Sequence, residues 1–347
     1  MADNAGTTGQ QALMDFAELN VLVRKETYSA SDKTRLLELE QRYRFADLNQ
    51  PKSMLIHLNK VRSQLYSTSK EGVVSVVADG CGDWTGWFEL RSDNITWEST
   101  YNTGRVVAEV KPDILICVEI EDRPTLMRFN EQVLKAQFQF EYPHVMLVDG
   151  NDERGIDVGI LSRYPISGVR SHVDERNADG TRIFSRDCPE YVIDLPGNQR
   201  LVVIPNHFKS KRGGDSPTVQ KRRLAQATTA SMIAQQALQI SPFVLLGGDL
   251  NDTPDSATLQ PLFSSGFKDV QSHPSYPIDR PGTYDTGTKA NKIDYLFMSP
   301  KLYTGLRGCG IERRGSYHPN TWTPFDTVTG KKDEASDHHL VWADFKV

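Results

Sequence analysis

The chain of 347 residues is long enough for one large α/β unit or for two average domains. Hydrophobic residues make up 38% and charged residues 24%, which excludes wholesale disorder and a fibrous architecture. With 40 Lys and Arg against 45 Asp and Glu, the formal net charge is −5, so the chain as a whole does not attract nucleic acid. Any phosphate-bearing partner must be held by a local basic patch or by a metal ion.

The four cysteines are too few for a disulfide scaffold, and none forms a C-x-x-C pair, which excludes structural zinc and thioredoxin-like redox chemistry. We expect four reduced thiols in a cytoplasmic protein, with extracellular pairing as the alternative. The first residues show no signal-peptide pattern. The longest uncharged run, residues 224–248, contains four Gln and one Pro, so the sequence predicts no membrane partner.

The first hundred residues are predicted to form a flexible tail and then a few short elements. Residues 16–23 are predicted as a strand. Helices are predicted at about 31–44 and 52–66, where apolar residues recur at helical spacing. A β-branched run and a glycine-punctuated loop with Trp84 and Trp87 complete this part.

From about residue 100, apolar strands alternate with amphipathic helices. Asp122 and Ser216 are predicted N-caps of helices, each with a proline in the first turn. Two strands on either side of residues 196–198 are predicted as a hairpin. The predicted strands are 114–118, 158–161, 191–193, 201–204, 243–246, 293–298 and 340–345. Because hairpins interrupt the alternation, the sequence predicts an α/β sandwich with mixed sheets rather than a parallel wound sheet.

Polar residues that can do chemistry lie at the beginning or the end of several of these strands. They are Glu119, Asn206, His207, Asp249, Asn251, Asp294, Asp337 and His338. One such residue alone is more often a turn or cap residue, but ligands in open α/β sheets bind beyond strand ends, so the set predicts a common cleft. His338 and His339 alternate along a strand, so only one of the two rings is expected to reach that cleft.

The residue types in this set narrow the chemistry. Carboxylate and amide oxygens suit hard cations such as Mg²⁺, Mn²⁺ or Ca²⁺. The sequence contains no H-E-x-x-H zinc motif, no G-x-S-x-G nucleophile elbow and no G-x-x-x-x-G-K-[ST] phosphate loop. Carboxylates, Asn and His without a covalent nucleophile therefore favour metal-assisted hydrolysis of a phosphate ester.

An ordered series of short segments resembles the endonuclease/exonuclease/phosphatase superfamily, which includes pancreatic-type deoxyribonuclease and abasic-site endonucleases. The segments are residues 16–21, 116–122, 155–163, 186–191, 206–210, 248–252, 292–295 and 336–338. The resemblance implies a two-sheet, four-layer α/β sandwich with mixed sheets and outer helices. It implies one domain at 14–347 after a flexible tail of residues 1–13. The long separation of Asn20 from Glu119 marks an inserted helical and Trp-rich segment at about 30–100.

The resemblance also implies a role for each site residue. The implied metal ligands for Mg²⁺ (or Mn²⁺) are Glu119, Asn20 and Asp337. The implied catalytic residues are His207, Asp249, Asn251, Asp294 and His338. The implied phosphate-binding residues are Arg186, Lys209 and Asn206. In this scheme Asp249 activates water in line with the scissile bond, and Asp294 fixes the tautomer of His338.

The function predicted from these residues is hydrolysis of nucleic-acid phosphodiester bonds, with DNA as the first candidate. Residues 207–223 carry six basic residues against a single Asp215, which is either a solvated face or a clamp for a nucleic-acid backbone. One alternative is a phosphatase or phosphodiesterase that acts on a small-molecule or lipid phosphate ester. The other is a catalytically silent binding protein. We expect a monomer.

Overall fold

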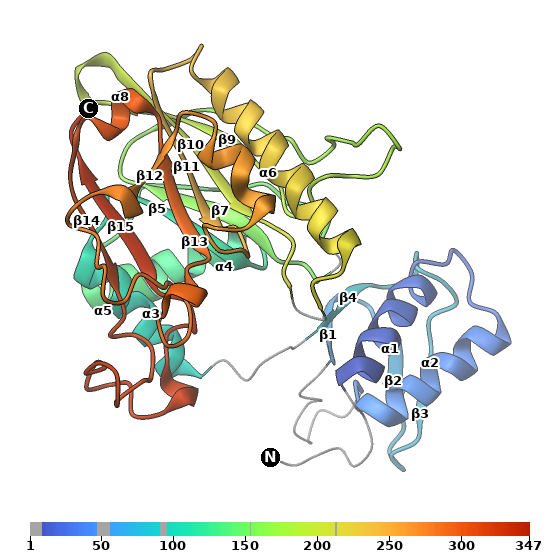
Figure 1. Ribbon diagram of the computed structural model, residues 1–347. Helices are drawn as coiled ribbons and strands as arrows, with labels where there is room; N and C mark the ends of the chain where they lie inside the picture. The colour runs from blue at the N-terminus through green and yellow to red at the C-terminus, as the bar shows by residue number, and fades with distance from the viewer. Residues whose placement is uncertain (1–8, 47–55, 91–95, 153, 212–213) are drawn as a thin grey trace. The chain divides into compact units, whose positions relative to one another are not determined.

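The computed structural model describes residues 9–46, 56–90, 96–152, 154–211 and 214–347. The chain falls into two units, residues 1–95 and 96–347 (Figure 1). The sequence predicts a single domain over residues 14–347 with an insertion at about 30–100, and the boundary between the two units falls within that predicted insertion. No helix of the described residues is long and apolar enough to cross a membrane.

The first unit has its own apolar core. Its elements are α1 (Gly9–Leu22), α2 (Ala30–Tyr43), β1 (Ile56–Arg62), β2 (Tyr66–Thr68), β3 (Val74–Val76) and β4 (Thr85–Leu90). β1 pairs with β4 and β2 pairs with β3, both antiparallel. Leu19 and Leu36 from the two helices and Ile56 and Phe88 from the β1–β4 pair are buried in one cluster. This shared core explains why these residues form a separate unit.

The strand predicted at residues 16–23 is wrong, because these residues belong to α1 up to Leu22. Ala12, Leu19 and Leu22 lie on one face of the helix and are all buried in the cluster of this unit. The burial of that face favours the helix over the extended conformation.

The helix predicted at 52–66 is also wrong, since residues 56–62 form strand β1; residues 52–55 lie outside the described residues. The pairing of β1 with β4 overrides the helical spacing of its apolar residues. The helix predicted at 31–44 is confirmed as α2, which begins at a capping box of Ser29 and Asp32.

The second unit is a mixed α/β structure with several sheets, as the sequence predicts. Its elements are α3 (Trp97–Val110), β5 (Ile114–Ile120), α4 (Arg123–Phe129), the π-helix η1 (Asn130–Lys135), α5 (Ala136–Phe138), β6 (His144–Leu147), β7 (Asp157–Ser162), β8 (Ile166–Arg170), β9 (Glu190–Leu195), β10 (Gln199–His207), α6 (Pro217–Ala237), β11 (Phe243–Asp249), α7 (Gln260–Phe263), β12 (Lys268–Asp269), β13 (Asp294–Met298), α8 (Pro300–Tyr303), β14 (Leu306–Glu312) and β15 (Leu340–Phe345).

The strands of this unit form a six-stranded sheet of order β12-β13-β11-β10-β9-β8, a three-stranded sheet of order β5-β7-β6, and the pair β14-β15. In the six-stranded sheet, β10 and β11 are parallel and the other pairs are antiparallel. The predicted hairpin at residues 196–198 is confirmed as β9–β10. The predicted N-caps Asp122 and Ser216 are confirmed at α4 and α6.

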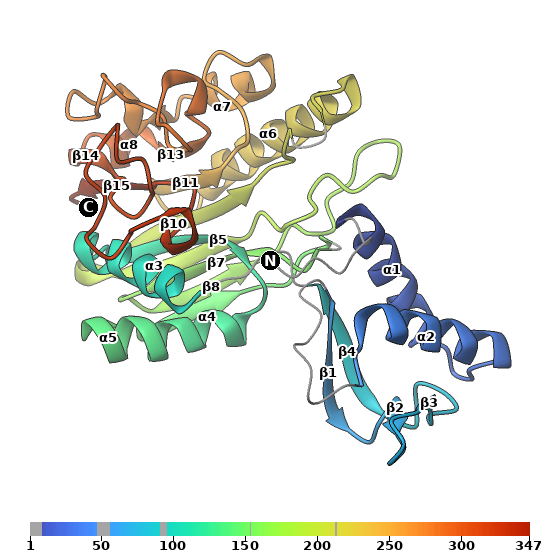
Figure 2. The same cartoon turned by 90° about the horizontal axis from the view of Figure 1, so that it is seen from below.

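The two faces of the six-stranded sheet pack against different partners. Val202 and Ile204 of β10 pack with Ile233 of α6 in one cluster, so α6 covers that face (Figure 1, Figure 2). Leu201 and Val203, which alternate with them, pack in a second cluster with Ile160 of β7. The opposite side of the three-stranded sheet is covered by α3 and α4 through a third cluster. The alternation leaves the strand ends as the places where polar side chains gather.

Candidate active site

Three neighbouring strands of the six-stranded sheet carry one polar residue each in a single transverse row. His207 at the end of β10 is in register with Asp249 at the end of β11. Asp249 is in register with Asp294 at the beginning of antiparallel β13. The sequence predicted that these strand ends converge, and the structure brings all three residues together.

Asp249 lies at the centre of this row and is only 5% exposed. Its Oδ1 accepts a hydrogen bond from the Asn251 main-chain nitrogen at 2.8 Å, and its Oδ2 accepts one from the Asn251 side-chain amide at 2.7 Å. Asn251 has a left-handed φ of 54°, which turns its side chain back toward Asp249. Burial and the neighbouring carboxylate of Asp294 raise the pKa of Asp249.

His207 is almost completely buried beside Asp249. Its Nε2 lies 3.4 Å from Asp249 Oδ2, and its Nδ1 is buried without a hydrogen-bond acceptor or donor among the described residues. Burial, together with the nearby positive charges of Arg186 and Arg154, places the pKa of His207 well below its ordinary value. The ring is therefore neutral at physiological pH.

His338 lies directly before β15 and faces Asp294. Its Nδ1 lies 3.0 Å from Asp294 Oδ2 and 3.1 Å from Oδ1. Burial opposes the charged imidazole, but Asp294 and then Asp249 outweigh that effect and raise the pKa of His338 to about 10. His339 points elsewhere, because its Nε2 bonds to the Asp285 carbonyl oxygen at 3.0 Å. The prediction that only one of the two rings joins the cleft is confirmed.

The structure does not assemble the three predicted metal ligands into a metal centre. Asn20 lies in α1 of the first unit, where its side-chain amide donates to the Phe16 carbonyl oxygen at 3.1 Å. Glu119 and Asp337 are exposed in the second unit. Within the described residues there is no group of three or more His, Cys, Asp or Glu side chains arranged to hold a metal ion. The chemistry of the donors fits a hard cation, but their arrangement does not complete a site.

Glu119 nevertheless has an unusual backbone conformation. It lies in β5 at an irregularity of the pairing with β7, where Val118 is opposite Val158 and Ile120 is opposite Asp157. Its φ of 61° is in the left-handed region, which a non-glycine residue seldom adopts outside turns and functional sites. A bulge of this kind re-aims one side chain out of the sheet pattern. The sequence placed Glu119 at a strand end and gave no sign of this conformation.

Two of the predicted phosphate-binding residues are buried and already engaged. Arg186 is 2% exposed, and its guanidinium donates to Asp152 Oδ2 at 2.9 Å and to the Phe208 carbonyl oxygen at 2.8 Å. Asn206 is fully buried and its amide donates to the Ile204 carbonyl oxygen at 3.0 Å. Through these hydrogen bonds, both side chains hold the backbone at the end of β10 in place.

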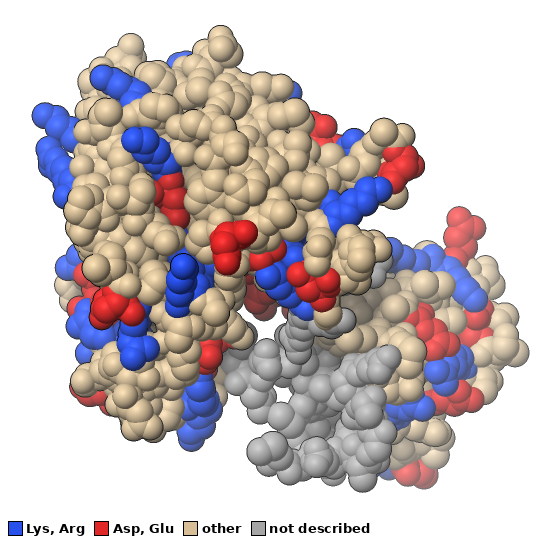
Figure 3. All heavy atoms as spheres, in the orientation of Figure 1, with Lys and Arg blue, Asp and Glu red and all other residues tan. Residues whose placement is uncertain are grey.

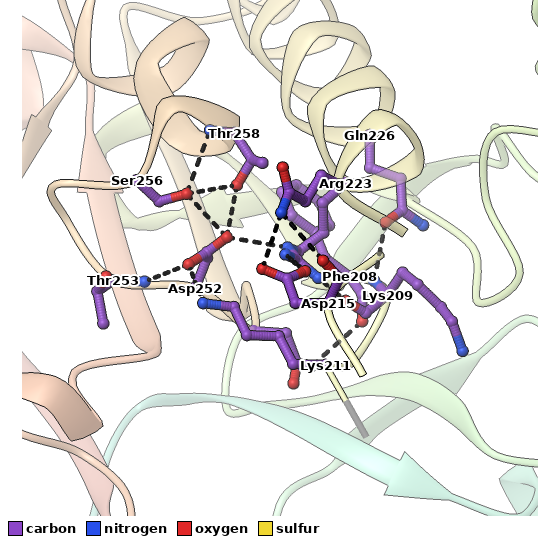
Figure 4. A network of polar contacts seen from close by, with 12 residues as sticks. Phe208, Lys209, Lys211, Asp215, Arg223, Gln226, Asp252, Thr253, Ser256 and Thr258 are labelled. Carbon is purple, nitrogen blue, oxygen red and sulfur yellow. Dashed lines mark hydrogen bonds and ion pairs between the residues drawn. The ribbon is translucent and has the colours of Figure 1, made fainter. Parts of the chain in front are cut away.

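In the predicted basic segment 207–223, some basic side chains form ion pairs and others do not. Figure 4 shows Asp252 at the centre of a network that takes up Lys211 and Arg223. Arg223 is fully buried, and it also donates to the Lys209 carbonyl oxygen and pairs with Asp215. The Lys209 side chain extends away from this network (Figure 4). Arg212 lies outside the described residues.

Within the described part of the chain, three basic side chains of this segment form no ion pair: Lys209, and Lys221 and Arg222 near the beginning of α6. On the face shown in Figure 3, the Lys and Arg side chains of the larger unit lie scattered among acidic and uncharged ones. On this face, the positive charge of the larger unit is therefore carried by separate side chains and not by one continuous basic patch.

One charged residue beside the site was not among the predicted ones. Arg154, in the loop before β7, binds Asp152 through two guanidinium nitrogens. After burial, its positive charge contributes to the lowered pKa of both His207 and Lys209. The sequence signal was the short polar run at 151–155, which is equally typical of an ordinary turn.

The site therefore combines a neutral imidazole, a charged imidazole and two carboxylates at neighbouring strand ends, without a covalent nucleophile. Such a set can orient water and stabilise negative charge that develops on a phosphorus centre. These are the features of a phosphoester hydrolase.

A model of the Endonuclease/Exonuclease/phosphatase family matches residues 99–338. The chain belongs to this family, whose members are metal-dependent phosphoester hydrolases, and it is an enzyme of that class. The match covers Glu119 and every predicted site residue after it, and it begins after Asn20. Among curated proteins, no match is found.

Solved structures support the same fold. A family member from Leptotrichia buccalis is 15% identical, with a TM-score of 0.50 over 74% of this chain and 95% of that one. A functionally unknown conserved protein from Enterococcus faecalis is 16% identical, with a TM-score of 0.50 over 73% and 93% of the two chains. Truncated TDP2 from Caenorhabditis elegans is also similar, with 17% identity and a TM-score of 0.47 over 72% and 90%.

Proposed function

We propose that the protein hydrolyses phosphodiester bonds of nucleic acid, with DNA as the first substrate to test. The observation that carries this proposal is the row of His207, Asp249 and Asp294, completed by His338 at 3.0 Å from Asp294. Lys209, two residues after His207 of that row, supplies positive charge for a polyanionic substrate.

In the proposed mechanism, Asp249 and Asn251 hold the attacking water at the end of β11. The charged imidazole of His338, oriented by Asp294, stabilises the negative charge that develops on the phosphate. His207 is neutral and donates or accepts a hydrogen bond at the same phosphate. Arg186 and Asn206 are positioning residues in this scheme, since both are buried.

For the cofactor we propose Mg²⁺ (or Mn²⁺), with Glu119 as its principal ligand and Asp337 nearby. Carboxylate oxygens suit these hard cations, and a bound ion supplies charge neutralisation at the phosphate. Because the described residues do not complete a metal centre, no step of the reaction is assigned to the ion. Asn20, whose side-chain amide donates to the Phe16 carbonyl oxygen within α1, is assigned no role here.

For the fold we propose the four-layer order α6, six-stranded sheet, three-stranded sheet with β14–β15, and α3 with α4. The three apolar clusters of the second unit support it. We further propose a monomeric, cytoplasmic enzyme, which is consistent with four free cysteines.

The test is an assay on plasmid DNA, single-stranded DNA, RNA and a generic small phosphodiester, with Mg²⁺ or Mn²⁺ and with a chelator. We expect metal-dependent cleavage of nucleic acid. Hydrolysis of the small ester alone would overturn the proposed substrate and favour the small-molecule or lipid phosphate alternative.

The metal assignment has its own test in Glu119→Gln, with Glu131→Gln as the control for an exposed glutamate of the same unit. Glu119→Gln keeps the shape of the side chain but removes its charge, so calorimetric titration is expected to show about 10- to 100-fold weaker Mg²⁺ or Mn²⁺ binding and a parallel loss of activity. Metal binding like that of the wild type would show that Glu119 is not a ligand.

A further inference from the structure

Arg154 is held in one orientation by the residues around it. Its Nε lies 3.0 Å from Asp152 Oδ1 and its Nη2 lies 3.2 Å from Asp152 Oδ2, so the carboxylate grips one edge of the guanidinium. Asp152 is itself fixed, because buried Arg186 donates to it from the other side at 2.9 Å. The Arg154 side chain remains 44% exposed. A largely buried ion pair thus presents an exposed guanidinium at a fixed position.

A continuous chain of hydrogen bonds connects this guanidinium to the reacting end of the site. Arg186 links Asp152 to the carbonyl oxygen of Phe208, the residue between His207 and Lys209. The same carbonyl oxygen accepts a bond from the Asn251 side chain at 3.2 Å. Asn251 in turn binds Asp249. Arg154 is therefore positioned relative to Asp249 by three intervening side chains and one backbone group.

The charges along this chain do not cancel. Asp152 is shared between two guanidinium groups, so the trio of Arg154, Asp152 and Arg186 carries a net charge of about +1 by simple counting of ionised groups. Lys209 adds a further positive charge, and its pKa is lowered by partial burial and then by the positive charges of Arg154 and Arg186. Arg154 Nη1 has no hydrogen-bond acceptor in the part of the chain that the structure describes. This nitrogen is available to an anion.

We propose that Arg154, with Lys209 beside it, binds a second phosphate of the substrate, next to the phosphodiester that is cleaved. A guanidinium fixed along one edge suits a phosphate, since it offers its remaining N–H groups in a fixed plane. The ligand class is a strand with successive phosphates. This inference rests on the proposed function and extends it, because it names the residue that distinguishes a polynucleotide from an ester with one phosphate.

The test compares two substrates with the same type of scissile bond. One is a dinucleotide with a single phosphodiester, and the other is an oligonucleotide with many. Arg154→Ala is expected to lower kcat/KM on the oligonucleotide about 10-fold or more, mainly through KM, and to leave the dinucleotide within about twofold of the wild type. The slope of the logarithm of affinity against the logarithm of salt concentration is expected to decrease by about one.

Arg163→Ala is the matched control, because Arg163 is an exposed arginine that follows the same strand, β7, at its other end and pairs with exposed Asp113. It is expected to change neither substrate. Arg154→Lys keeps the charge but loses the bidentate grip of Asp152, so an intermediate KM is expected. Unfolding curves for each variant separate a binding effect from a loss of the native fold.

The outcomes are distinct. An equal loss on both substrates, or no loss on either, would overturn the assignment of Arg154 while leaving nucleic-acid cleavage in place. Failure of the wild-type enzyme to cleave either nucleic-acid substrate, with hydrolysis of a small phosphate ester retained, would overturn the proposed function and the inference with it.

Discussion

Two histidines on either side of Asp249 have opposite protonation states. His207, at the end of β10, is buried near Arg186 and Arg154, and its pKa lies well below the ordinary value. His338, before β15, faces Asp294 at 3.0 Å, and its pKa is raised to about 10. The pKa values of the two rings move in opposite directions because burial dominates at His207, whereas the carboxylate of Asp294 outweighs burial at His338.

This difference in protonation gives the two histidines different chemical roles in the site. A charged imidazole can neutralise negative charge on a phosphate, whereas a neutral imidazole can only donate or accept a hydrogen bond. Asp294 is in register with Asp249 and binds His338, so it maintains the charged member of the pair. The neutral member depends chiefly on its burial, to which the positive charge of Arg186 adds. Replacing Asp294 is therefore the direct way to break the contrast.

The largest effect is expected for Asp294→Asn. Losing the carboxylate removes the main support of the charged imidazole and its fixed orientation, so the pKa of His338 is expected to fall from about 10 toward its ordinary value of 6.5. Turnover is expected to drop about 10²- to 10⁴-fold, the range for loss of one positioned acid–base group. An NMR titration of the ring and a phosphodiesterase assay measure the two effects.

Asp194→Asn provides the control, since Asp194 is an exposed carboxylate of β9 that pairs with Arg200 at 3.4 Å. It is expected to leave both readings unchanged. Metal titration of Asp294→Asn is expected to match the wild type, because Asp294 is assigned to His338 and not to the ion. Full turnover in Asp294→Asn would show that this assignment is wrong.

The residues of this row could be identified from the sequence, but the contrast between the two rings could not. Asp249, Asp294 and His338 each follow or begin an apolar strand, and strand register then brings them together without further information. The contacts that set the two protonation states were not visible. Arg154 and Asp152 lie in a loop of ordinary composition, and only the tertiary structure places their charges beside His207. Local pattern predicts which residues end a strand, but it does not predict which loop packs over them.

In the fold, too, local sequence pattern predicts some elements, and tertiary contacts decide others. The elements after residue 100 were largely predicted, because strands buried on both faces give clear apolar runs bounded by turn signals. Before residue 60, α2 was predicted but α1 and β1 were not, because the decisive information for these two lies in long-range contacts. Residues 56–62 have helical spacing, but their pairing with β4 makes them a strand. The apolar residues of α1 are buried against α2 and the β1–β4 pair, which favours the helix.

A second and smaller effect sharpens the contrast between the two rings. A glutamine amide can replace the hydrogen-bonding Nε2 of a neutral imidazole but not the charge of an imidazolium. His207→Gln is therefore expected to lower kcat/KM only about 10-fold, the equivalent of one lost or misplaced hydrogen bond. His338→Gln is expected to lose about 10²-fold or more. Equal losses in the two variants would contradict the assigned protonation states.

The smallest effect is expected at a third histidine, His172, which is also buried and faces carboxylates, and which serves as a comparison for the charged His338. His172 is buried away from the row, with Nε2 at 2.8 Å from Glu190 and Nδ1 at 3.2 Å from Glu175. Burial opposes its charge, but the hydrogen bonds to Glu190 and Glu175 outweigh that effect and raise the pKa of His172. Both ring nitrogens can donate to these carboxylates only when the ring is charged.

Because the folded-state pKa of His172 lies above the unfolded value of 6.5, its contribution to stability is complete below pH 6.5 and is lost as the pH rises through the folded-state pKa. His172→Gln keeps a neutral donor toward Glu190, so it is expected to reduce the free energy of unfolding by about 1 kcal/mol at low pH and by less at high pH. Urea unfolding at several pH values, with His144→Gln of β6 as the control, measures the difference. A loss that is independent of pH would show that His172 is neutral in the folded protein, and that facing carboxylates do not by themselves keep a buried imidazole of this protein charged.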